Sequence, residues 1–167
     1  MSFKLQVPLP IKLAATVVAT TLLYTYIGQL VPQKEMLPPE ETVIRTDMTT
    51  EDLVAAGEQV ARNKGICLTC HTIGEGGAGL RFPDLSGIGS RAATQVEGLS
   101  ELEYLAQSLY QPNVYIVPGF SPGMPEIDRP PIGLTDPEIR AVIAWLQSLG
   151  GTPTVTMETE IPFAGGG

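Results

Sequence analysis

The stretch Gly65-Ile66-Cys67-Leu68-Thr69-Cys70-His71 contains both cysteines and the only histidine of this 167-residue chain. A disulfide between Cys67 and Cys70 would close a very small loop and would stabilise the fold little. Zinc would want four ligands, and two cysteines with one histidine leave that set one short. A thioredoxin-like redox pair is expected after a strand, whereas helix signals precede Cys67.

The spacing C-x-x-C-H is typical of covalent haem attachment. It lets two thiols reach the two vinyl groups of one porphyrin while the adjacent imidazole meets the iron from one side. We therefore expect Cys67 and Cys70 to bind one haem c and His71 to be an axial ligand of its iron. Because the only histidine is then committed, methionine, lysine, water or nothing remains for the second axial position.

Capping-box spacing predicts three helices in the part of the chain around this motif. The pairs are Thr49 with Asp52, Ser100 with Glu103, and Thr135 with Glu138, and they predict helices over about 50–63, from 100 to just before Pro112, and from 135 to Gly150. The segments 72–98 and 111–134 are rich in Gly and Pro and show no strand alternation, so they are expected to be loops that pack on something. The sequence thus predicts an all-α domain.

A run of 19 uncharged residues from Leu13 to Val31 is close to the roughly 20 needed to cross a membrane as a helix. A cleaved signal peptide is the alternative, but its apolar stretch is typically about 7 to 15 residues and ends in a small-x-small site. This run instead ends Tyr24-Thr25-Tyr26-Ile27. We expect an uncleaved single-pass anchor.

Lys4 and Lys12 precede the run without any acid, so the positive-inside rule places the N-terminus in the cytoplasm and the rest on the extracytoplasmic side. The expected organisation is an N-terminal segment with a transmembrane anchor (1–31), a linker containing Pro32, Pro38 and Pro39 (32–48), a globular domain (49–150) and an extended tail (151–167). Membrane lipid is thus one expected partner.

The formal net charge is −8, and no patch dense in Lys and Arg with interleaved aromatic residues is present. A nucleic-acid partner is therefore not expected. A partner with a basic surface fits the charge better, although acidity often serves solubility alone.

Over about Thr50 to Gly150 the chain resembles a monohaem class I cytochrome c. The resemblance is carried by a helix before C-x-x-C-H, then Pro83-Asp84-Leu85, Met124-Pro125, and a last helix with Trp145-Leu146. It implies an all-α fold of three to five short helices around one haem. It also implies that the first and last helices of the domain cross, with Gly57 and Val60 against Trp145 and Leu146.

The resemblance also implies roles for three residues outside the attachment motif. Pro83 would lend its carbonyl to the imidazole N–H of His71, and Arg91 would face a haem propionate; a loop turn and an exposed arginine are the simpler interpretations. Met124 stands where the family presents its axial sulfur. Most methionines fill cores, but the segment PGFSPGMPEID has no apolar residues at helical spacing to which Met124 could belong. This favours a ligand role for Met124.

His/Met ligation gives a relatively high potential, and a filled sixth site leaves no place for a substrate. The expected function is single-electron transfer without bond chemistry of its own. The segment QPNVYIVPGFSPGMP resembles the axial-methionine loop of monohaem subunits of respiratory membrane complexes, notably alternative complex III.

This second resemblance implies a subunit of a respiratory or photosynthetic complex on the periplasmic side of a bacterial cytoplasmic membrane. Such a subunit would relay electrons from quinol to a cytochrome, a cupredoxin or an oxidase. A free tethered carrier, a five-coordinate haem enzyme or gas sensor, and an assembly subunit are the alternatives.

Overall fold

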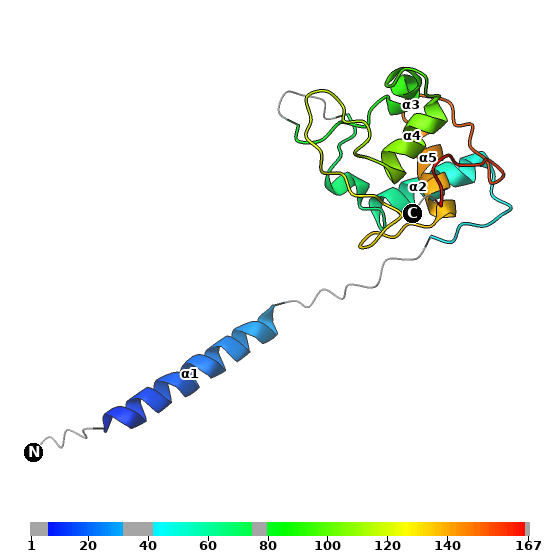
Figure 1. Ribbon diagram of the computed structural model, residues 1–167. Helices are drawn as coiled ribbons and strands as arrows, with labels where there is room; N and C mark the ends of the chain where they lie inside the picture. Colours follow the sequence, from blue (N-terminus) through cyan, green and yellow to red (C-terminus); the bar gives the residue numbers. More distant parts are fainter. Residues whose placement is uncertain (1–6, 32–41, 75–79, 166–167) are drawn as a thin grey trace, which may run out of the picture. The chain divides into compact units, whose positions relative to one another are not determined.

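The computed structural model describes residues 7–31, 42–74 and 80–165, which belong to two separate compact units (Figure 1). The first unit contains helix α1 (Leu9–Leu30). The second contains four α-helices and two short 3₁₀ turns: α2 (Thr50–Arg62), η1 (Cys67–Thr69), α3 (Ile88–Arg91), η2 (Ala92–Thr94), α4 (Glu101–Tyr110) and α5 (Asp136–Ser148). The described residues include no β-strand, so the predicted all-α class is confirmed.

Helix α1 has 22 residues and is about 33 Å long at ~1.5 Å per residue. It begins after Pro8, one turn earlier than expected, and includes Lys12. The hydroxyls of Thr16, Thr20 and Thr21 each donate to the carbonyl four residues before, which satisfies them inside the helix. By length and composition α1 can cross a membrane. The linker prolines Pro32, Pro38 and Pro39 lie outside the described residues.

The three predicted helices of the second unit are confirmed as α2, α4 and α5. Thr49 and Asp52 cap α2 reciprocally, and Ser100 and Glu103 do the same for α4. At α5, the Glu138 carboxylate accepts hydrogen bonds from the backbone N–H and the hydroxyl of Thr135. The polar pairs that the sequence displays therefore satisfy backbone donors at the starts of these helices.

Helices α2 and α5 pack directly against each other, and Gly57 sits at the point of contact. A Cβ built on Gly57 would lie 2.9 Å from the Cβ of Trp145 and would collide with the backbone carbonyl of Ala141. Trp145 is 3% exposed, so the ring is part of the core. The predicted approach of Gly57 to Trp145 is confirmed, and only glycine permits it.

The structure differs from the sequence prediction in the segment expected to be one long loop from 72 to 98. Residues 88–94 form α3 and η2. The Gly89 N–H donates to the Leu149 carbonyl at 3.1 Å, and a Cβ on Gly89 would lie 2.9 Å from the Gly151 nitrogen. This close docking on the end of α5 explains a short helix in a segment that has little helical periodicity of its own.

The described part of the segment after α5, up to residue 165, has no helix or strand. It packs on its own domain through Gln147, a buried residue of α5. The side-chain oxygen of Gln147 accepts from the backbone N–H groups of Thr154 (2.9 Å) and Val155 (3.3 Å). Arg140 donates to the Thr159 carbonyl at 3.1 Å. These hydrogen bonds hold the tail against its own domain.

Residues 42–48, expected to belong to the linker, have no helix, yet Ile44 and Met48 pack against the core of the second unit.

Candidate haem-binding site

The second unit contains a cavity of about 220 Å³ that brings together all six residues expected to form the site: Cys67, Cys70, His71, Pro83, Arg91 and Met124. Its remaining walls come mainly from apolar side chains of α4, α5 and the segment 115–127. Residues separated by more than 50 positions in the sequence therefore line one space.

The attachment motif forms a tight turn at the end of α2. The Gly65 N–H donates to the Val60 carbonyl at 2.7 Å, Ile66 takes a left-handed conformation (φ 46°), and the His71 N–H donates to the Cys67 carbonyl at 2.9 Å. Cys67 is half-buried and Cys70 is exposed. Burial raises the pKa of the Cys67 thiol to about 11, so this sulfur stays protonated at neutral pH while it is free.

The imidazole of His71 is oriented by one hydrogen bond. Its Nδ1 lies 2.8 Å from the carbonyl oxygen of Pro83. Because a carbonyl can only accept, Nδ1 carries the proton, and Nε2 is the ring nitrogen left for a metal. The Phe82 ring lies 6.3 Å from the imidazole, centroid to centroid, and is tilted by 53°.

Arg91 lines the cavity and also holds the loop that contains Pro83. Its guanidinium donates to the carbonyl oxygen of Asp84 at 2.6 Å and to that of Ser86. A guanidinium has more N–H donors than these two bonds use, so donors remain for a second acceptor.

Met124 is half-buried and lines the cavity. The other methionines among the described residues, Met48 and Met157, pack elsewhere on the core and do not line it. Met1 and Met36 lie outside the described residues.

Sequence reasoning missed several residues of the site. Tyr104 of α4 lines the cavity and meets the Tyr115 ring edge-on, with 6.0 Å between centroids. Asp84 was noted only as part of a motif, yet it accepts hydrogen bonds from Thr72 and Ser86, which hold the pKa of its carboxyl well below its usual range. Burial raises the pKa of Tyr104. The spacing of Asp84 and Ser86 could have indicated the hydrogen bond between them, because an Asp side chain often accepts from the backbone N–H two residues on.

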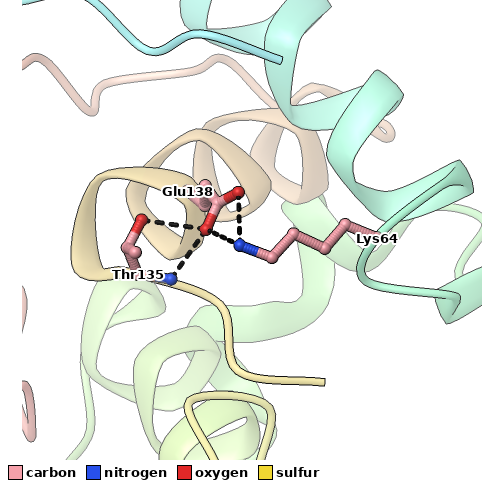
Figure 2. A network of polar contacts seen from close by, with 3 residues as sticks. All are labelled: Lys64, Thr135 and Glu138. Carbon is pink, nitrogen blue, oxygen red and sulfur yellow. Dashed lines mark hydrogen bonds and ion pairs between the residues drawn. The ribbon is translucent and has the colours of Figure 1, made fainter. Parts of the chain in front are cut away.

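An ion pair fixes the chain just before the attachment motif. Figure 2 shows Lys64 reaching Glu138, the residue that also accepts from Thr135 at the start of α5. The segment leading into Cys67 is thereby fastened to the last helix.

The residues present fit a haem c. Two thiols stand at C-x-x-C-H spacing, an imidazole has its Nδ1 occupied and its Nε2 unused, and a thioether shares the same largely apolar cavity. This donor set suits iron porphyrin, whose rim is apolar and whose iron takes nitrogen and sulfur ligands.

Comparison with protein families matched the cytochrome c model over residues 54–150. Comparison with curated proteins gave no match. The match begins within α2 and covers the attachment motif and α5, together with the residues that line the cavity. The chain belongs to the cytochrome c family, and accordingly it binds a c-type haem covalently and serves in haem-based electron transfer.

Proposed function

We propose that this chain is a membrane-anchored electron carrier that binds haem c through Cys67 and Cys70 and ligates its iron with His71 and Met124. The observation that carries the proposal is the composition of the cavity: Met124 is the described methionine that shares it with His71 and both cysteines. The supply of donors supports this ligand pair, since His71 is the only histidine in the chain.

Each residue has a definite task in this proposal. The cysteines fasten the porphyrin to a rigid turn, and Pro83 holds the His71 ring through Nδ1 and fixes its tautomer. The remaining donors of Arg91 serve a propionate. Met124 fills the sixth position and so excludes substrates and small ligands.

Bound haem supplies a one-electron redox couple. The apolar walls formed by residues such as Leu105, Leu109 and Val142 exclude water from the cavity. Low polarity disfavours the more highly charged oxidised iron, and thioether ligation favours the reduced iron as well. The chain's own residues thus favour a relatively high potential and no bond chemistry.

Replacement of the sixth ligand tests this assignment. Met124→Ala is expected to keep haem attached, lower the midpoint potential and allow the reduced protein to bind carbon monoxide. Met48→Ala and Met157→Ala are matched controls, because both side chains pack outside the cavity. The same behaviour in a control but not in Met124→Ala would show that another methionine is the ligand.

The domain organisation we propose has residues 1–31 as an anchor, 32–48 as a linker, 49–150 as the haem domain and 151–167 as a tail. The support for the anchor is α1, a 22-residue helix with a mean hydropathy of 1.4 in its most apolar window and none of its residues buried. Lys12 near its start favours a cytoplasmic N-terminus and a periplasmic haem domain.

We further propose that the anchored domain is a fixed subunit of a respiratory or photosynthetic complex of the alternative complex III kind. It would take electrons that originate from quinol and deliver them to a cytochrome, a cupredoxin or an oxidase. The support is the resemblance of the loop around Met124 to that of such subunits, together with the apolar helix.

Salt dependence separates a fixed subunit from a free tethered carrier. Association steered by charge slows steeply as ionic strength rises, whereas transfer inside a preassembled complex hardly changes. We expect flash-reduction kinetics of the haem in detergent-purified membranes to be insensitive to salt. Strong slowing, or purification of the chain as a lone monomer, would identify a free carrier instead.

A further inference from the structure

The carboxylate of Asp84 joins the segment that follows His71 to the segment that contains Pro83. One oxygen accepts from the Thr72 hydroxyl at 2.6 Å. The other accepts from the backbone N–H of Ser86 at 2.7 Å and from that of Gly74 at 3.3 Å. Thr72 and Gly74 lie one and three positions after His71, whereas Ser86 belongs to the segment that contains Pro83.

Backbone and guanidinium contacts reinforce this junction. The Leu85 N–H donates to the Thr72 carbonyl at 2.8 Å. Arg91 of α3 donates to the carbonyl oxygens of Asp84 and Ser86. The residues that immediately follow Pro83 are thus held both to the attachment motif and to α3.

We propose that Asp84 is the positioning residue of the axial histidine. By binding the two segments together, Asp84 keeps the Pro83 carbonyl on Nδ1 of His71. The inference rests on the axial role proposed for His71. His71 and Pro83 are 12 positions apart, so contacts beyond the peptide chain must hold their 2.8 Å hydrogen bond. A carboxylate suits this task because it accepts several hydrogen bonds at once, and bonds to a charged acceptor are stronger than neutral ones.

This positioning has an electronic consequence. A carbonyl that accepts from Nδ1–H increases the basicity of the imidazole, which stabilises the oxidised iron. When the Pro83 segment is loosened, this effect weakens and the midpoint potential rises.

The test uses the haem-loaded full chain and compares Asp84→Ala with Asp84→Asn. Both variants lose the negative charge. The amide oxygen of asparagine can still accept from Ser86 and Gly74, while its N–H can donate to the Thr72 hydroxyl. Asp47→Ala is the control for a carboxylate lost elsewhere, since the ion pair that Asp47 makes among the described residues is with the exposed Arg45.

Two readouts are measured: the solvent-exchange rate of the His71 Nδ1 proton by NMR and the midpoint potential. Asp84→Ala should speed exchange about tenfold, the factor expected for one weakened hydrogen bond. It should also raise the potential more than Asp84→Asn does, and Asp47→Ala should change neither. Equal effects of alanine and asparagine on both readouts would show a charge effect alone and would overturn the proposal.

Thr72→Val tests the positioning role of Asp84 if Asp84→Ala fails to retain haem. It keeps the charge and removes one of the three bonds to the carboxylate, so exchange should be about threefold faster. An unchanged rate would overturn the proposal. Absence of an axial-histidine Nδ1 signal from the unmodified chain would instead refute the proposed ligation by His71, and this inference with it.

Discussion

Lys64 Nζ lies 2.8 Å from Glu138 Oε2 and ties the approach to the attachment motif to the first turn of α5 (Figure 2). The same carboxylate oxygen accepts from the Thr135 N–H at 2.8 Å and from its hydroxyl at 2.9 Å. Glu138 therefore performs two tasks at once: it caps a helix and anchors a segment that is distant in the sequence.

Replacement of Glu138 by glutamine should lower the stability of the domain in a pH-dependent way. Burial by itself raises the pKa of Glu138, but the bonds from Lys64 and Thr135 outweigh it and the pKa is lowered. Because the folded pKa lies below the unfolded value, this carboxylate stabilises the fold at neutral pH. The stabilisation is lost as pH falls from about the ordinary value of 4.5 through the lower folded value.

Glu138→Gln preserves a capping partner and removes the charge, so the expected loss at pH 7 is about 0.5 to 1 kcal/mol, the range for a partly exposed ion pair. Urea denaturation at pH 7 and below the glutamate pKa measures it. Glu103→Gln is the control, since Glu103 forms the same capping box with Ser100 but has no ion pair among the described residues. A deficit at pH 7 no larger than that of Glu103→Gln would mean that Lys64 contributes nothing.

Alanine at position 57 should destabilise the domain. The added methyl collides with the Ala141 carbonyl where α2 and α5 meet, and overpacking of this kind costs about 1 to 3 kcal/mol. Thermal unfolding of the haem-loaded domain measures the change. Ala55→Gly, at an exposed position of the same helix, calibrates helix propensity. Propensity alone favours alanine, so a stabilised Gly57→Ala would contradict the close contact.

Loss of the Gln147 side chain should detach the tail. Gln147→Ala leaves the N–H groups of Thr154 and Val155 without their acceptor, at a cost of about 1 to 3 kcal/mol. Hydrogen exchange at Val155 should become faster, whereas Gln59→Ala, an exposed glutamine of α2, should leave it unchanged. Full protection of Val155 in Gln147→Ala would show that other contacts hold the tail.

Covalent haem attachment should depend on both cysteines. Cys67→Ser or Cys70→Ser removes one of two bonds to the porphyrin, and haem staining after denaturing electrophoresis should weaken in either variant. The double variant should not stain. Undiminished staining of the double variant would exclude attachment at this motif.

Much of the domain could be predicted because its helices begin with local signals. Thr49 with Asp52, Ser100 with Glu103, and Thr135 with Glu138 lie within one helical turn of each other, so sequence spacing reveals them. The attachment motif is equally local. The contact of Gly57 with α5 joins distant segments and was expected only from the resemblance to a family.

The parts that sequence could not predict depend on tertiary contacts. Helix α3 docks on the end of α5 through Gly89. No capping box precedes α3 in the sequence, so its start could not be predicted from local spacing. The tail is fixed by Gln147, a buried polar residue on the otherwise apolar face of α5. The sequence around Gln147 does not indicate that its side chain binds the backbone of Thr154 and Val155. The role proposed for Asp84 depends on the structure, because only there does its carboxylate accept hydrogen bonds from both Thr72 and Ser86.

The near-infrared absorption of the ferric full-length chain tests most directly whether Met124 and His71 form the axial pair. A haem with methionine sulfur on its ferric iron shows a weak band in this region. We predict that the band is present in the unmodified chain and in Met157→Ala, and that it is absent from Met124→Ala. No band in the unmodified chain, or a band that survives in Met124→Ala, would contradict the account.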